Sequence, residues 1–159
     1  MMQKNNIIIR QAKNSDAEQI GEIEKNCFSQ PWTVNQIKKE INNEKAIFIV
    51  ASADDIICGY ISGQLIIDEF YISNIAVSSD FRNLGIATAI IKKLIEILMQ
   101  MKCALLSLEV RESNVIARKL YENTGFVNLG LRKNFYSAPK ENACIYTLYL
   151  TNPEKECID

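Results

Sequence analysis

The chain has 159 residues, 48% of them hydrophobic and 23% charged, and this composition is typical of a folded protein rather than a disordered one. Its length favours one domain, which we assign to residues 1–150, followed by a polar tail over residues 151–159. The 18 basic and 19 acidic residues give a formal net charge of −1, which argues against non-specific binding to nucleic acid or to anionic membranes. The sequence has no histidine, which excludes Ser-His-Asp and Cys-His nucleophile pairs and every metal site that uses histidine.

The cysteines predict free thiols rather than disulfides or a zinc site. No two of them form a C-x-x-C pair, and their number is odd. Buried free thiols are typical of a reducing compartment. No apolar stretch approaches the roughly 18 residues that span a bilayer, and residues 1–10 lack a signal-peptide core. We therefore expect a cytoplasmic protein without a metal. The cysteines are Cys27, Cys58, Cys103, Cys144 and Cys157.

In chain order, the first half of the sequence predicts strands and helices in alternation. Asn6 to Gln11 contains three consecutive β-branched residues and predicts a buried strand. Ser15 to Glu18 has the spacing of a capping box, which predicts a helix that runs to about Asn26. Thr33 to Gln36 has the same spacing before a second helix. Three strands are predicted next, at residues 46–51, 56–67 and 70–77, with turns at Asp54-Asp55 and Asp68-Glu69.

The second half continues with a long amphipathic helix from Ile86 to about Lys102 and a strand over residues 104–110. Asn114 can cap a further helix whose apolar side would carry Ile116 and Tyr121, and Gly125 suits the left-handed position after that helix. Two closing strands are predicted at residues 126–131 and 143–150. The order β-α-α-β-β-β-α-β-α-β-β predicts a mixed α/β sheet with early antiparallel strands and a later βαβ crossover.

A candidate phosphate site lies where the strand ending at Val77 leads through a polar loop and Gly85 into the long helix. Such a junction exposes unpaired backbone N–H groups at the positive end of a helix dipole, and glycine lets an anion approach the backbone. An ordinary strand-to-helix turn also favours glycine, so both interpretations stay open. The sequence contains neither G-x-x-x-x-G-K-[ST] nor G-x-G-x-x-G after a strand, which excludes the P-loop and Rossmann sites.

The segment from Arg82 to Ala87 has the form R-x-x-G-x-A and resembles the acetyl-CoA-binding motif of GNAT N-acetyltransferases. The resemblance covers roughly residues 8–150. Residues 74–77, 108–114, 120–126 and 132–136, together with Pro31-Trp32, are similar to segments of the bacterial RimI-type enzymes, which acetylate the N-terminal alanine of a small-subunit ribosomal protein. Ala87 and Phe135 depart from that subfamily, which often has Gly and Tyr there. The fold this implies is the GNAT acyl-CoA N-acyltransferase fold, with a twisted, mostly antiparallel sheet splayed between its fourth and fifth strands and flanked by about four helices.

The resemblance also assigns roles to individual residues. It implies that Glu109 is a general base and Tyr121 a general acid, and that Trp32 and Tyr136 contact the acceptor. From the sequence alone, Glu109 could equally be a surface residue, and the aromatic side chains could belong to the core. The cofactor-binding residues implied in this way are Ile75, Ala76, Val77, Arg82, Asn83, Leu84, Gly85, Ile86, Ala87, Thr88 and Asn114.

Three functions remain open. The first is acetyl transfer from acetyl-CoA, without a metal, to the N-terminal amine of a protein such as a ribosomal protein. The second is acetyl transfer to a small amine such as a polyamine or an aminoglycoside. The third is a non-catalytic acyl-CoA-binding module, against which the presence of both Glu109 and Tyr121 counts. We expect a monomer or a weak dimer that binds neither nucleic acid nor membranes directly.

Overall fold

Strands and helices follow one another in the order that the sequence predicts. The computed structural model describes residues 6–150, so the predicted tail and Cys157 lie outside the described residues. The strands are β1 (Ile7–Gln11), β2 (Ala46–Ala53), β3 (Ile56–Ile66), β4 (Glu69–Val77), β5 (Leu105–Arg111), β6 (Val127–Ser137) and β7 (Lys140–Tyr149). The α-helices are α1 (Ala17–Cys27), α2 (Val34–Ile41), α3 (Ile86–Gln100) and α4 (Val115–Asn123).

The strands form one mixed sheet in the order β1-β2-β3-β4-β5-β7-β6. The pairs β1–β2, β2–β3, β5–β7 and β6–β7 are antiparallel, whereas β4 and β5 are parallel. The register of β4 with β5 joins Glu69–Tyr71 to Leu105–Ser107. The mixed sheet is thus confirmed, and its splaying between these two strands stays a prediction. The chain divides into two compact units, residues 6–65 with 72–94 and residues 66–71 with 95–150.

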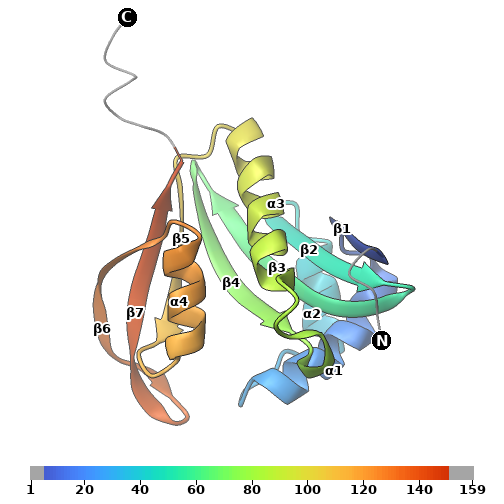
Figure 1. Cartoon of the computed structure of the whole chain (residues 1–159), viewed down its shortest axis with the longest axis horizontal. Helices are drawn as coiled ribbons and strands as arrows, with labels where there is room; N and C mark the ends of the chain where they lie inside the picture. Colours follow the sequence, from blue (N-terminus) through green and yellow to red (C-terminus); the bar gives the residue numbers. More distant parts are fainter. Residues whose placement is uncertain (1–5, 151–159) are drawn as a thin grey trace, which may run out of the picture. The chain divides into compact units, whose positions relative to one another are not determined.

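In the first unit, α1 and α2 cover one face of the strands. Their apolar residues, such as Ile20 and Ile37, form a buried cluster with Phe48, Val50 and Tyr60 of β2 and β3. Because side chains alternate along a strand, the intervening residues of β2 face the other way. Figure 1 shows α3 on the near face of β2–β4 and α2 behind these strands. Two helical layers therefore bury both faces of these strands.

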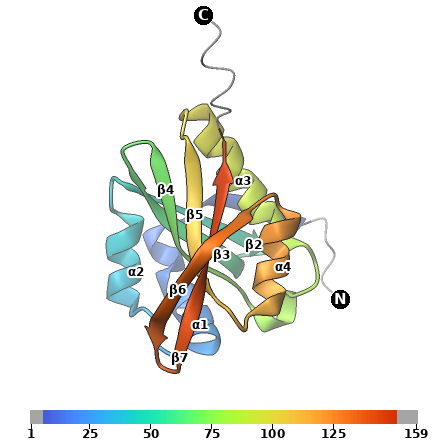
Figure 2. The same ribbon diagram turned by 90° about the vertical axis from the view of Figure 1, so that its left-hand side faces the viewer.

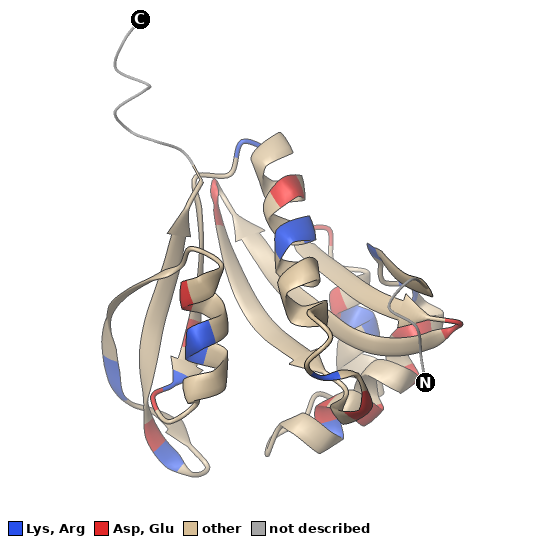
Figure 3. Ribbon diagram, viewed as in Figure 1, with Lys and Arg blue, Asp and Glu red and all other residues tan. Residues whose placement is uncertain are grey.

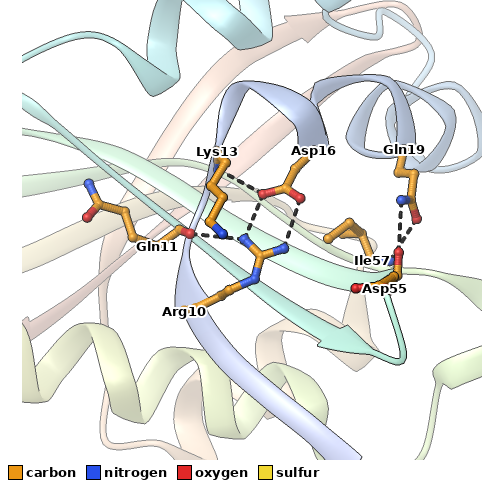
Figure 4. Close-up of polar contacts among 7 residues, drawn as sticks. All are labelled: Arg10, Gln11, Lys13, Asp16, Gln19, Asp55 and Ile57. Carbon is orange, nitrogen blue, oxygen red and sulfur yellow. Dashed lines mark hydrogen bonds and ion pairs between the residues drawn. The ribbon is translucent and has the colours of Figure 1, made fainter.

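The start of α1 is fixed by Asp16 rather than by the capping box predicted at Ser15, which is wrong. The Asp16 carboxylate accepts hydrogen bonds from both terminal nitrogens of Arg10, at 2.8 and 2.9 Å, and from the backbone N–H of Lys13 at 2.8 Å (Figure 4). These bonds, chiefly those from Arg10, lower the pKa of Asp16. Sequence spacing did not reveal this contact because Arg10 belongs to a strand, six residues earlier.

Gln19 ties α1 to the turn between β2 and β3. Its side chain donates to the carbonyl of Asp55 at 3.1 Å and accepts from the backbone N–H of Ile57 at 2.8 Å (Figure 4). Asp54 and Asp55 both have positive φ, which confirms the predicted turn. The second predicted turn is displaced by one residue: Ile67 and Asp68 form it, and Glu69 begins β4. Ile67 has φ of 60°, a conformation that β-branched residues rarely adopt. The residue type at position 67 therefore did not predict a turn there.

In the second unit, α4 lies beside the hairpin of β6 and β7 (Figure 2). The predicted N-cap is confirmed, since the Asn114 side chain accepts from the N–H of Ala117 at 3.1 Å. Gly125 has φ of 101° after α4, as predicted. Ile116, expected on the apolar side, is 86% exposed. The predicted strand 126–131 was too short, because β6 is held by pairing with β7 while its side chains remain largely exposed and give no alternating pattern.

No helix within residues 6–150 is long and apolar enough to cross a membrane.

Candidate active site

The loop before α3 leaves open space beside Gly85, and the phosphate site suggested there by the sequence stays a prediction. Gly85 has φ of +77°, and an added Cβ would meet no atom within 4 Å. The first hydrogen bond of α3 runs from the N–H of Ala89 to the carbonyl of Gly85, at 3.0 Å. The backbone N–H groups of residues 86–88 come before this bond and have no partner within the helix. The first turn of α3 carries no acidic residue (Figure 3). This helix N-terminus therefore fits a phosphate group.

Gly59 allows β3 to approach the end of β4 closely. An added Cβ would lie 2.9 Å from the carbonyl oxygen of Ala76 and 3.2 Å from a methyl group of Val77. A glycine inside a strand pattern often marks such an approach, and this signal was present in the sequence. Any larger residue at this position would displace part of the strand that we expect to bind the cofactor.

The guanidinium of Arg82 folds back onto its own unit. Its Nε donates to the carbonyl of Val77 at 3.3 Å, and one terminal nitrogen lies 3.7 Å from Sγ of Cys27. The side chain of Arg82 thus binds the last residue of β4. This arrangement fits a role of the Arg82 backbone, rather than its charge, in contact with a phosphate.

Trp32 lies in the loop between α1 and α2 and packs against the buried cluster of the first unit. Its backbone N–H donates to the Glu24 carboxylate at 3.1 Å. It also borders a cavity of about 540 Å³ whose other lining residues are Gln36, Lys39, Glu40, Asn43 and Gln64. Trp32 is therefore partly core and partly surface, so both interpretations of this residue hold in part.

Glu109 lies on the half-buried face of β5, between the buried residues Leu108 and Val110. Its side chain is 28% exposed, and Oε1 is 3.7 Å from a terminal nitrogen of Arg132 on β6. Tyr71 of β4 donates its hydroxyl proton to Glu69 at 2.6 Å, and this hydrogen bond raises the pKa of Tyr71. The carboxylate of Glu109 is accordingly reachable by solvent.

Tyr121 of α4 is buried, with 4% of its surface exposed. Its ring centre lies 5.7 Å from that of Phe126 and 6.0 Å from that of Tyr146. Within residues 6–150 its hydroxyl makes no hydrogen bond, so the ring belongs to the core while the hydroxyl is available as a donor. Burial raises the pKa of Tyr121, which keeps the phenol protonated at neutral pH.

Tyr136 of β6 belongs to the same unit as Glu109 of β5 and Tyr121 of α4. The pairing of β5 with β7 sets Tyr146 opposite Leu108, the neighbour of Glu109, and the Tyr146 ring lies 6.0 Å from that of Tyr121. Burial raises the pKa of Tyr136. The Arg111 guanidinium stacks 4.2 Å from the centre of the Tyr136 ring, and the ring of Phe135 meets it edge-on at 5.0 Å. The second unit therefore brings together three of the predicted site residues. Asn114 uses its oxygen to cap α4, as described above.

Three residues of these surroundings were missed in the sequence: Glu24, Gly59 and Arg132. Glu24 could have been found, because it follows Ile20 by four positions and thus shares the apolar side of α1. Arg132 could not, because its contact with Glu109 depends on how β6 and β5 each pair with β7. Residues 6–150 contain no cluster of three Cys, Asp or Glu side chains that could hold a metal ion.

Comparison with known proteins gives consistent matches. The model of the acetyltransferase (GNAT) family matches residues 17–126. A ribosomal protein bS18-alanine N-acetyltransferase of Haemophilus ducreyi is 35% identical over 140 residues, covering 85% of this chain and 94% of that protein. The crystal structure of the ribosomal-protein-S18-alanine N-acetyltransferase from Escherichia coli matches with a TM-score of 0.84 and 28% identity, covering 92% of this chain and 95% of that one.

A more distant structure, Arabidopsis thaliana NAA60 in complex with acetyl-CoA, matches with a TM-score of 0.83 and 18% identity, over 90% of this chain and 99% of that one. At this level of identity the likeness concerns the fold alone. The fold implied by the sequence resemblance is confirmed by these matches.

Proposed function

Because the chain belongs to the acetyltransferase (GNAT) family, we propose that it transfers the acetyl group of acetyl-CoA to the N-terminal amine of a protein, with the N-terminal alanine of a ribosomal protein as the acceptor. The acceptor is suggested by the names of the Haemophilus ducreyi and Escherichia coli proteins. The observation that carries the catalytic part is geometric: β5, which holds Glu109, pairs with β7, and the ring of Tyr146 on β7 lies 6.0 Å from that of Tyr121. We assign residues 1–150 to this one enzymatic domain.

In this proposal the cofactor is held mainly by backbone groups. The amides at the start of α3 and the loop before it would bind phosphate oxygens, and residues 75–77 of β4 would line the acyl end. Gly85 supports this assignment because the space beside its Cα is empty. Asn114 would contact the cofactor through its side-chain NH₂ group, since its oxygen already accepts from Ala117.

Glu109 acts as the general base. It removes a proton from the amine, directly or through a water molecule, as the amine nitrogen bonds to the acetyl carbon. At pH 7 deprotonation costs about 1.2 kcal/mol for an α-amine and about 4.6 kcal/mol for a lysine. A single carboxylate is therefore better matched to an N-terminal amine than to a lysine side chain.

Tyr121 acts as the general acid. As the carbon–sulfur bond breaks, its phenol donates a proton to the departing sulfur of CoA. A phenol is protonated at neutral pH, so Tyr121 has a proton to give to a thiolate whose conjugate thiol has a pKa of about 8.5. Both substrates are bound together, so orientation supplies much of the rate and no covalent enzyme intermediate is needed.

The decisive experiment is an acetyl-transfer assay against three sets of acceptors: peptides with different N-terminal residues, peptides with an acetylated N-terminus and an internal lysine, and polyamines. Preferred acetylation of peptides that begin with alanine supports the proposal. Faster transfer to polyamines would show that the acceptor is a small amine rather than a protein. Binding of acetyl-CoA without transfer to any acceptor would favour a non-catalytic module.

A further inference from the structure

Glu24 of α1 is a carboxylate that lies entirely within the first unit. None of its surface is exposed, although acidic residues are almost never fully buried unless they are paired. It is not among the residues assigned above to the cofactor or to proton transfer. Its burial therefore needs an explanation of its own.

Three donors from three elements converge on this carboxylate. The hydroxyl of Tyr60 on β3 and the side-chain NH₂ of Asn74 on β4 both donate to Oε1, the latter at 2.7 Å. The backbone N–H of Trp32 donates to Oε2 at 3.1 Å. In all three contacts Glu24 is the acceptor, so its two oxygens join α1 to β3, to β4 and to the loop that carries Trp32.

The contact with Trp32 differs from the other two because Trp32 lies in a loop, whereas Tyr60 and Asn74 lie on strands. The loop of residues 28–33 is fixed at its start by the bond from the N–H of Phe28 to the carbonyl of Glu24, at 2.9 Å. It is fixed at its end by the capping box of Thr33 and Gln36. Between these ends, Pro31 has no amide proton, and the Trp32 N–H bonds to the carboxylate of Glu24. Glu24 thus sets the position of Trp32 relative to β3 and β4.

We propose that Glu24 is a positioning residue that holds the Trp32 loop in the conformation that binds the acceptor. The inference rests on the proposed function, together with the acceptor contact that the sequence resemblance implies for Trp32. Glu24 itself touches neither substrate. Its loss therefore weakens acceptor binding while the binding of acetyl-CoA and the chemical step are largely retained.

The test compares Glu24→Gln with Tyr60→Phe. A glutamine offers one acceptor oxygen in place of two, so it cannot serve Trp32 on one side and Tyr60 with Asn74 on the other as these donors now lie. Tyr60→Phe removes a donor from the same carboxylate but leaves the bond to Trp32 intact, which makes it the matched control. Both variants are expected to lower the melting temperature by a similar amount.

We expect Glu24→Gln to raise the KM for the acceptor peptide roughly tenfold, which corresponds to the loss of about one hydrogen bond. In that variant kcat and the KM for acetyl-CoA should change less than threefold, and in Tyr60→Phe the peptide KM should stay within twofold of the parent. Trp32 is the only tryptophan, so its fluorescence reports on the loop without any substrate. Its emission should shift to the red and be quenched more by acrylamide in Glu24→Gln alone.

Unchanged quenching and an unchanged peptide KM in Glu24→Gln would overturn the inference, as would equal changes in Tyr60→Phe. If Glu24→Gln does not fold, replacing Trp32 by its α-hydroxy acid removes only the N–H donor and must produce the same two changes. Quenching requires no acceptor, so it separates the inference from the proposed function. If quenching of Trp32 increases while the peptide KM is unchanged, Glu24 does hold the loop, but the role of Trp32 in acceptor binding is refuted.

Discussion

Replacing Tyr121 by phenylalanine removes one hydroxyl group and leaves the ring in place. The ring keeps its contacts with Phe126 and Tyr146, whose centres lie 5.7 and 6.0 Å away. The hydroxyl makes no hydrogen bond within residues 6–150. The free energy of unfolding should therefore decrease by less than the value for a lost hydrogen bond, which is about 0.5–1.5 kcal/mol. If the phenol protonates the departing sulfur, kcat should instead fall roughly 10²–10⁴-fold.

The assay combines kcat, the affinity for acetyl-CoA by calorimetry and the melting temperature. We expect the first to fall sharply and the other two to remain close to the parent values. An acyl donor whose thiol has a lower pKa needs less protonation as it leaves, so it should recover part of the rate in Tyr121→Phe. The same donor should not help Glu109→Gln. Equal recovery in both variants, or a kcat within threefold of the parent in Tyr121→Phe, would refute the assignment of the acid.

The remaining predictions concern three other sites. Glu109→Gln should lower kcat roughly 10²–10⁴-fold and less at high pH, where the α-amine is already neutral. Arg132→Gln breaks the same ion pair, and an equal loss in that variant would mean that the pair, not the base, matters. Gly85→Ala should weaken acetyl-CoA binding measured by calorimetry, whereas Gly125→Ala, which also has positive φ, should not; equal affinities would argue against a phosphate at the first glycine. Asp16→Asn should cost about 1–3 kcal/mol at pH 7 by denaturant unfolding. Since the folded-state pKa of Asp16 is lowered, its contribution is fully present above pH about 4 and is lost as the pH falls through the folded-state pKa, so the difference between variant and parent should shrink steadily below pH 4; a constant difference would contradict this.

Sequence patterns predicted those features that depend on neighbours along the chain. The capping box at Thr33 and the N-cap at Asn114 are both confirmed because each needs only residues three positions apart. The box at Ser15 failed because Ser15 lies inside a 3₁₀ turn, Asn14–Asp16, in which the Asp16 carboxylate accepts from the N–H of Lys13. Strand β6 was shortened in the prediction because an exposed strand lacks the alternation that burial imposes.

The candidate site divides in the same way. The loop at Gly85 was predicted because a glycine between a strand and a helix is visible in the sequence. The tether of Trp32 by Glu24 was not, because it requires that α1, β3 and β4 already be folded together. The roles of Glu109 and Tyr121 came from family resemblance and remain predictions.

Strand β6 ends the strand order, and its exposed side chains include Val127, Leu129 and Leu131. A strand of this kind can recruit other chains into intermolecular sheets, which leads to aggregation. Here the register of β6 with β7 shifts twice, between Asn128 and Gly130 and again between Arg132 and Tyr136. Such irregularities twist the outer edge and limit the length over which a foreign strand can pair. The two register shifts therefore interrupt the edge that β6 presents, independent of any catalytic role of the residues around them.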